Sequence, residues 1–354
     1  MSILFAILLF SILIFIHELG HFVAAKLSGV QVNEFSVFMG PALWKKQVGE
    51  TLYAIRLIPI GGYCAMEGED GGSENPRSFS VAAWWKKLII LVAGAAMNFI
   101  IGVILMIIVY LPISGEIAVP VIKSFEAYAT VNGEQGLRVG DEIIEVDGEK
   151  IFVYSDFAMI LSLNEGDVHD LVVRREGKKV ALKDFYMERH EVAQADGSSR
   201  MLFGMNFATR TLNFGNKLTY AWNQSMNTVR MVRLSLQMLF TGKAGFSDMS
   251  GPVGIVSQMS AVAEASETWV DALLNLLYFG GFIAINLAVM NLLPIPALDG
   301  GRIVGVLITS AVEALTHKKI DPKYEGYLHG AGMILLLGLM AVIMFKDIFV
   351  LFKG

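Results

Sequence analysis

Four long apolar segments constrain this chain more than any other feature of its sequence. Residues 1–16 carry no charged side chain, and neither do residues 88–111 or 272–293. A helix needs about 20 residues to cross the hydrocarbon core of a bilayer. We therefore expect an α-helical multi-pass membrane protein with four transmembrane helices. They are predicted at about residues 2–22, 88–111, 272–293 and 330–352.

Composition supports this class and excludes others. Only 17% of the 354 residues are charged, whereas about a quarter are charged in a typical soluble domain. A net charge of −5 and a high apolar content exclude a disordered chain. The 28 basic and 33 acidic residues argue against a nucleic-acid partner. Cys64 is the single cysteine, so a metal site would need His, Asp or Glu ligands.

The distribution of lysine and arginine predicts the orientation in the cell membrane. No basic residue precedes the first apolar segment, whereas residues 25–87 hold several. Because positively charged short loops stay in the cytoplasm, residues 25–87 should lie inside and both termini outside. The membrane core then has two halves, residues 1–111 and 271–354. The β-forming residues and glycines of segment 34–67 predict a cytoplasmic β-hairpin region.

An external α+β domain is predicted over residues 116–190. Short apolar runs alternate there with glycine-containing turns, and the Asp-Gly and Glu-Gly dipeptides at 147–148 and 176–177 are typical of hairpins. A connector, residues 191–270, follows it. Within the connector, apolar residues recur every three or four positions over 217–240, which predicts an amphipathic helix. Such a helix could lie equally well on a membrane surface or on a protein face.

The motif His17-Glu18-Leu19-Gly20-His21 follows directly on the first apolar segment. On a helix, residues four apart lie on one face, so the two imidazoles can share one zinc ion. Glu18 is close enough to take a proton from a water activated there. Ionisable groups at membrane depth cost several kcal/mol each and are usually functional. The motif therefore predicts a hydrolytic zinc site.

A catalytic zinc needs a third protein ligand, and Asp299 is the best candidate. It lies in the stretch 291–301, Asn-Leu-Leu-Pro-Ile-Pro-Ala-Leu-Asp-Gly-Gly, whose prolines break the third apolar helix. The first and third helices run in the same direction, so their carboxyl ends meet on one side of the membrane. The alternative role for Asp299 is to cap a helix over 300–315. Glu34 and Asp347 are weaker rival ligands.

Together these motifs resemble the site-two protease family of intramembrane zinc metalloproteases. The resemblance is strongest to the bacterial RseP-like branch, which processes membrane-bound anti-sigma factors. The two metal motifs, at 17–21 and 291–301, match the family pattern. Weaker matches with some departures (Val37, Met39 and Ala95) lie at 35–41, 61–66, 93–98 and 250–255.

The resemblance implies a role for each site residue. His17, His21 and Asp299 would hold Zn²⁺, and Glu18 would be the catalytic base of a zinc metalloendopeptidase. Substrate-binding roles are implied for Asn291 and Pro294, and for a strand edge that includes Gly61, Gly62 and Tyr63. That edge could pair with an unwound substrate segment. Asn98 would serve either catalysis or a hydrogen bond between helices.

The external domain resembles a PDZ domain over 136–148, although the usual Ser-Pro-Ala stretch before it is absent. A single PDZ-like domain is expected. The partners implied are single-pass transmembrane proteins in the lipid bilayer, such as anti-sigma factors or signal-peptide remnants, with a site-one protease acting upstream. A transporter would normally show an inverted repeat, which we do not find. A PDZ membrane scaffold would not explain Glu18 between two histidines.

Overall fold

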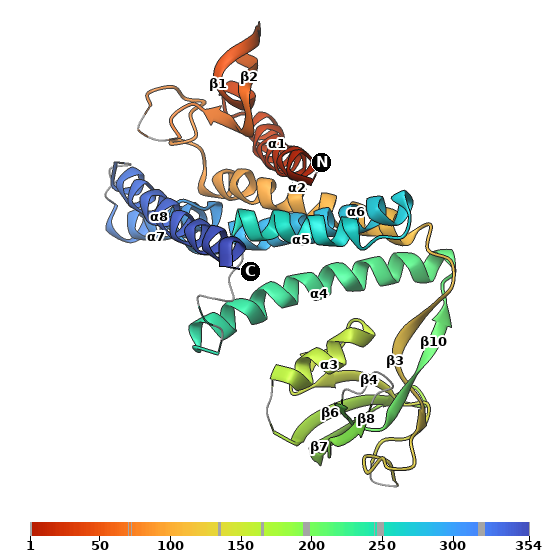
Figure 1. The fold of residues 1–354 in the computed structure, drawn as a ribbon. Coiled ribbons are helices and arrows are strands. Elements are labelled where there is room, and N and C mark those ends of the chain that lie inside the picture. Colours follow the sequence, from red (N-terminus) through yellow and green to blue (C-terminus); the bar gives the residue numbers. More distant parts are fainter. Residues whose placement is uncertain are drawn as a thin grey trace. The chain divides into compact units, whose positions relative to one another are not determined.

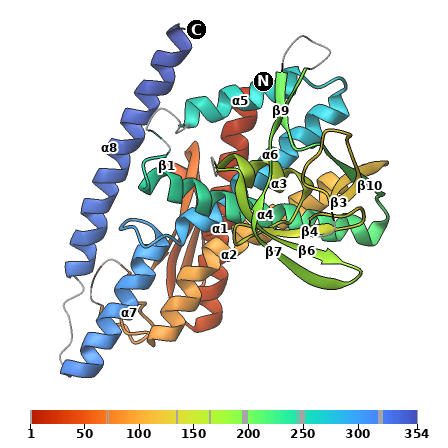
Figure 2. The ribbon, with the colours of Figure 1, turned by 90° about the horizontal axis from the view of Figure 1, so that it is seen from below.

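The computed structural model divides the chain into two compact units (Figure 1). Unit 1 comprises residues 1–109 and 228–354, and unit 2 comprises residues 110–227. Figure 2 shows the ribbon from a second direction. The structure describes residues 2–69, 71, 73–133, 136–163, 166–193, 199–243, 245, 251–317 and 323–353.

Most helices belong wholly or partly to unit 1. They are α1 (Ser2–Ser28), α2 (Trp84–Tyr110), α4 (Phe214–Phe240), α5 (Pro252–Glu264), α6 (Trp269–Asn291), α7 (Asp299–Thr316) and α8 (Lys323–Lys353). Four of them, α1, α2, α6 and α8, are long and apolar enough to cross a membrane, which confirms the four predicted apolar helices. Helix α6 ends at Asn291 rather than at the predicted 293, because the residue before Pro294 is disfavoured in a helix.

Glycines let the apolar helices of unit 1 approach closely. A Cβ atom on Gly20 of α1 would lie 2.4 Å from the carbonyl oxygen of Ala93 on α2. A Cβ atom on Gly102 of α2 would lie 2.5 Å from the Ile285 side chain of α6. Without a hydrophobic driving force between helices in lipid, such small residues allow the close packing that holds a bundle together.

Strands β1 (Val32–Val48) and β2 (Thr51–Met66) form the predicted β region of unit 1. Each strand bends, so that the first half of β1 lies between the two halves of β2. Phe35 pairs with Tyr53 on one side and with Cys64 on the other. Residues 62–66 pair only with the first half of β1 among the described strands, so they form an edge of this sheet. We call residues 62–66 the edge segment.

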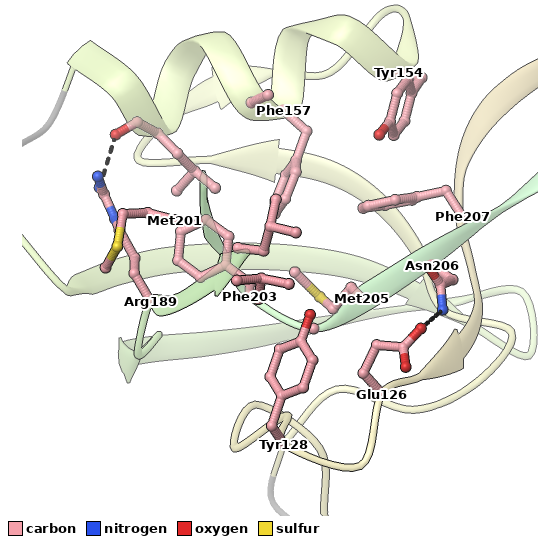
Figure 3. A pocket seen from close by; sticks show the side chains of 15 residues that line it. Glu126, Tyr128, Tyr154, Phe157, Arg189, Met201, Phe203, Met205, Asn206 and Phe207 are labelled. Atoms are coloured by element: carbon pink, nitrogen blue, oxygen red, sulfur yellow. Dashed lines mark hydrogen bonds between the residues drawn. The ribbon is translucent and has the colours of Figure 1, made fainter. Parts of the chain in front are cut away.

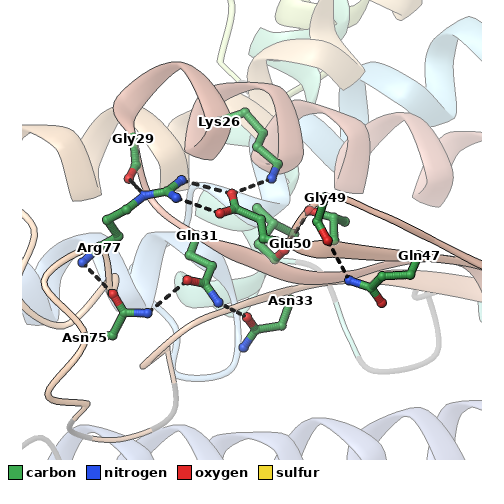
Figure 4. Close-up of polar contacts among 11 residues, drawn as sticks. Lys26, Gly29, Gln31, Asn33, Gln47, Gly49, Glu50, Asn75 and Arg77 are labelled. Carbon is green, nitrogen blue, oxygen red and sulfur yellow. Dashed lines mark hydrogen bonds and ion pairs between the residues drawn. The ribbon is translucent and has the colours of Figure 1, made fainter.

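A charged network fixes the turn between β1 and β2 (Figure 4). The Glu50 carboxylate ion-pairs with Arg77 at 2.6 Å and with Lys26 of α1 at 2.8 Å, while Arg77 also donates to the carbonyl of Gly29. Hydrogen bonds from Arg77 and Lys26 lower the pKa of Glu50 to about 2. Because the folded pKa is depressed, this stabilisation is present above the unfolded value near 4.5 and is lost as pH falls toward 2.

Unit 2 contains an antiparallel sheet of order β10-β3-β4-β6-β7, with β5 paired to β4 and a separate β8-β9 pair. The strands are β3 (Glu116–Phe125), β4 (Glu142–Val146), β5 (Glu149–Lys150), β6 (Val168–Arg175), β7 (Lys178–Tyr186), β8 (His190–Ala193), β9 (Ser199–Leu202) and β10 (Met205–Thr211), and α3 is Tyr154–Leu163. Both predicted hairpin dipeptides have positive φ at each residue, as in type I′ turns.

The sheet extends beyond the boundary predicted from sequence. Strand β10 lies in the predicted connector 191–270, but it pairs antiparallel with β3, from Met205 opposite Phe125 to Thr211 opposite Glu116. A pairing between strands this far apart in the chain leaves no local pattern to detect. The predicted helix 217–240 lies within α4.

Helix α8 holds α5 through a buried carboxylate. Asp347 accepts hydrogen bonds of 2.9 Å from the backbone N–H groups of Gly251 and Gly254, at the start of α5. Asp347→Ala should lower the free energy of unfolding by about 1–2 kcal/mol, because two donors at a helix start lose their acceptor. Asp347→Asn keeps an acceptor oxygen and should lose less. Thermal unfolding in detergent measures both, and equal losses would contradict the capping role.

Candidate metal and catalytic site

Helix α1 presents two imidazoles from one face, as the spacing predicts. The Nε2 atoms of His17 and His21 lie 3.1 Å apart, and the rings meet edge to face. Both side chains are largely shielded from solvent, with exposed fractions of 12% and 9%. The lone pairs of two nitrogen atoms at this distance repel each other unless a proton or a cation lies between them.

Helix α2 packs closely against both imidazoles. Nδ1 of His21 lies 2.8 Å from the carbonyl oxygen of Ile90, so Nδ1 carries a proton and Nε2 is left free as a metal ligand. One turn further, a Cβ atom on Gly94 would lie 2.4 Å from His21 Nε2 and 2.7 Å from His17 Cε1. A larger residue at 94 would therefore displace both rings.

Asp299 does not cap its helix. Leu298 is the N-cap residue of α7, without a side-chain cap bond, and Asp299 is the first helical residue. Its Oδ2 atom lies 3.1 Å from His17 Nε2 and 3.4 Å from His21 Nε2. The geometry thus favours the ligand role over the capping role that sequence left open.

These three side chains fit a zinc ion. Ligand atoms about 2.0–2.1 Å from a tetrahedral zinc lie roughly 3.3 Å from one another. The three observed separations, 3.1, 3.1 and 3.4 Å, agree with that spacing. Among the described residues, Oδ2 of Asp299 is buried without a hydrogen-bond partner, which a cation would supply. His17, His21 and Asp299 are also the group of possible metal ligands that the described residues bring together.

The Glu18 side chain of α1 contacts the edge segment. Its Oε2 atom accepts a 3.0 Å hydrogen bond from the backbone N–H of Cys64. A Cβ atom on Gly62 would lie 3.9 Å from Glu18 Cγ. The sequence did not predict this contact, because a backbone donor leaves no signal in residue type. Burial raises the pKa of the Cys64 thiol, so this side chain stays neutral beside the site.

Two asparagines flank the other nitrogen of His17. The amide nitrogens of Asn98 on α2 and Asn291 on α6 each lie 3.4 Å from His17 Nδ1. Asn98 is 1% exposed. Both residues were singled out from sequence, and the structure brings both to the same imidazole. A zinc ligand through Nε2 needs its proton on Nδ1, so an asparagine amide holds the ring for this role with its oxygen turned toward Nδ1 to accept that proton.

The remaining predicted residues divide into those near the site and those engaged elsewhere. Gly61 adopts φ +74° and directly precedes the edge segment, and Pro294 is exposed in the turn before Asp299. The Tyr63 hydroxyl, in contrast, accepts a 2.6 Å hydrogen bond from Arg56. Burial raises the pKa of this hydroxyl. The Tyr63 hydroxyl is therefore hydrogen-bonded within the sheet and not to the metal group.

Neither rival ligand reaches the metal group. Glu34 forms a 2.6 Å ion pair with Arg56, and Asp347 caps α5.

The sequence was also compared with known proteins. The model of peptidase family M50 matches residues 5–339. The chain is 36% identical over 349 residues to a Clostridium acetobutylicum protein named as a zinc metalloprotease, covering 98% of this chain and 97% of that one. A Fusobacterium nucleatum protein with the same kind of name is 34% identical, and both chains are covered fully. The Bacillus subtilis regulator of sigma-W protease RasP is 26% identical, with 97% of each chain covered.

Proposed function

This chain belongs to peptidase family M50 and is a membrane-embedded zinc metalloprotease, and we propose that His17, His21 and Asp299 hold its Zn²⁺ with Glu18 as the general base. The observation that carries this assignment is the set of three ligand atoms 3.1–3.4 Å apart around one centre. When bound there, Zn²⁺ would polarise the scissile carbonyl and acidify the attacking water.

Glu18 performs the proton transfers of the proposed reaction. Its carboxylate, one residue from His17, takes a proton from the attacking water and then donates it to the leaving amine. The Cys64 N–H holds this carboxylate beside the metal group at rest. Asn98 and Asn291 keep the His17 ring in place during the reaction.

The proposed substrates are transmembrane segments of single-pass membrane proteins, such as anti-sigma factors or signal-peptide remnants left by a site-one protease. A transmembrane helix must unwind locally before attack, because its peptide groups are paired internally. The edge segment lies beside Glu18 and has a strand partner on one side only among the described residues. An unwound substrate can add here as a strand. The substrate strand would accept the hydrogen bond of the Cys64 N–H in place of Glu18. The Glu18 carboxylate would then be available to take a proton from the attacking water.

Zinc content and cleavage, measured together on the purified chain, test this function. We expect one zinc per chain and hydrolysis of a single-pass substrate within its transmembrane segment. A non-catalytic PDZ scaffold would bind no zinc in this site, and a transporter would leave the substrate intact. Stripping the metal with a chelator should stop cleavage, and added zinc should restore it.

Unit 2 is proposed to be a single PDZ-like domain outside the cytoplasm, with both chain termini on that side. A cavity of about 530 Å³ lies beside α3 and β10 (Figure 3). Phe207 of β10 packs against Phe157 and Tyr154 of α3, with ring centroids 5.5 and 4.9 Å apart. Strand β10 is at the edge of its sheet, so a peptide can pair with it while its side chains enter the cavity.

In this proposal the PDZ-like unit acts as a size filter against substrates with intact external domains. Deleting Glu116–Thr211 should leave zinc bound and should let larger substrates be cut. The deletion must include β10, because Thr211 pairs with Glu116 and the two ends of the cut therefore lie side by side. Cleavage of long and pre-trimmed substrates is compared by gel. Loss of cleavage of the trimmed substrate in a folded, zinc-loaded core would contradict the filter.

A further inference from the structure

One carboxylate joins the end of the edge segment to the helix that begins with Asp299. Glu69 lies three residues beyond β2. Its Oε2 atom accepts a 3.3 Å hydrogen bond from the backbone N–H of Met66, and its Oε1 atom forms an ion pair with Arg302 of α7. Both charged side chains are shielded, with exposed fractions of 17% for Glu69 and 26% for Arg302. The pair therefore bridges two elements that contribute to the proposed site.

The position of Arg302 supports a specific role for this contact. Arg302 lies three residues after Asp299 and so on the same side of α7. A cation in the first turn of a helix is unfavourable, because the helix dipole places partial positive charge there. Glu69 offsets that cost with a charge-assisted hydrogen bond. The two side chains thus favour one placement of α7 relative to the end of β2.

The edge segment has two such attachments. The N–H of Cys64 donates to Glu18 of α1, and the N–H of Met66 donates to Glu69. Residues two apart in a strand present their backbone groups on the same side. The side of the strand that faces away from β1 is therefore held by both helices that carry the metal group, α1 directly and α7 through Arg302.

We propose that Glu69 and Arg302 are a positioning pair, which sets the edge segment at the working distance from the metal group and so places the scissile bond. This inference rests on the proposed function, in which a substrate strand adds to that segment. The pair touches neither substrate nor metal. It acts through the placement of the strand, so it should affect the rate without removing zinc.

Arg302→Met, which keeps length and removes the charge, tests the proposal, and Arg302→Lys is the conservative variant. Three quantities are measured on the full chain: zinc content, kcat/KM on a transmembrane substrate, and amide hydrogen exchange of residues 62–66 in zinc-stripped protein. A charge-assisted hydrogen bond is worth enough to change a rate or an opening equilibrium by about tenfold or more. We expect Arg302→Met to keep zinc, raise exchange and lower kcat/KM by about that factor. Arg302→Lys should recover most of both losses.

Arg174→Met in unit 2 is the matched control. Arg174 is an exposed arginine that ion-pairs with Glu142 at 2.7 Å, so the same change there should leave all three quantities unaltered. Unchanged exchange in Arg302→Met would overturn the pair as an attachment of the strand. Raised exchange with unchanged kcat/KM would overturn its role in placing the substrate, and loss of zinc would show that Arg302 supports the ligand instead. Failure of the proposed function appears separately, as wild-type protein without zinc or cleavage.

Discussion

Glu18→Gln should keep its zinc and lose cleavage by about a hundredfold or more. The substitution preserves size and a carbonyl oxygen, so the hydrogen bond from the Cys64 N–H can persist. It removes the group that takes and returns the proton, and general acid–base catalysis is typically worth 10²–10⁴-fold in rate. His17 and His21 are untouched, so the ion stays bound. Metal analysis and cleavage rates on the same detergent-purified sample measure the two effects.

The control for this experiment is Glu34→Gln. Glu34 is also a half-buried carboxylate, but it pairs with Arg56 in the sheet and lies outside the metal group. The Glu34→Gln substitution should therefore change neither the zinc content nor the cleavage rate. Normal cleavage by Glu18→Gln would remove the proposed base and, with it, the water-activation mechanism as a whole.

Asp299→Ala should lose zinc and activity together. This change strips one of three protein ligands, and even weaker changes around a metal site cost about 10–100-fold in affinity. We expect zinc affinity to fall by more than about a hundredfold, with cleavage below detection at ordinary zinc concentrations. Titration with a competing chelator gives the affinity, and excess zinc in the cleavage assay shows how much of the rate returns.

Asp347→Ala and Glu34→Ala are the negative controls for Asp299→Ala. Both positions are rival ligands by sequence, and both carboxylates have other partners, Asp347 at the start of α5 and Glu34 at Arg56. Neither variant should lower the affinity for zinc. Full zinc and a normal rate in Asp299→Ala would remove Asp299 from the site and would make these two carboxylates the next candidates.

Much of this protein follows from local sequence pattern. Uninterrupted apolar runs predict the membrane helices because each run must satisfy its own backbone hydrogen bonds in lipid. The four-residue spacing of His17 and His21 places both imidazoles on one face, and the structure shows them 3.1 Å apart. The Asp-Gly and Glu-Gly turns follow from the same kind of local rule, since positive φ favours those residues.

Other features depend on residues far apart in the chain, and only the tertiary structure determines them. The sequence left Asp299 with two roles, and the structure favours the proposed ligand role because it places the Asp299 carboxylate 3.1 Å from His17. The β3-β10 pairing and the hydrogen bond from the Cys64 N–H to the Glu18 carboxylate both use backbone donors, which residue type does not encode locally. The bridge from Glu69 to Arg302 spans 233 positions. Such contacts form only after the helices have packed, because each requires two distant segments to be held at one distance.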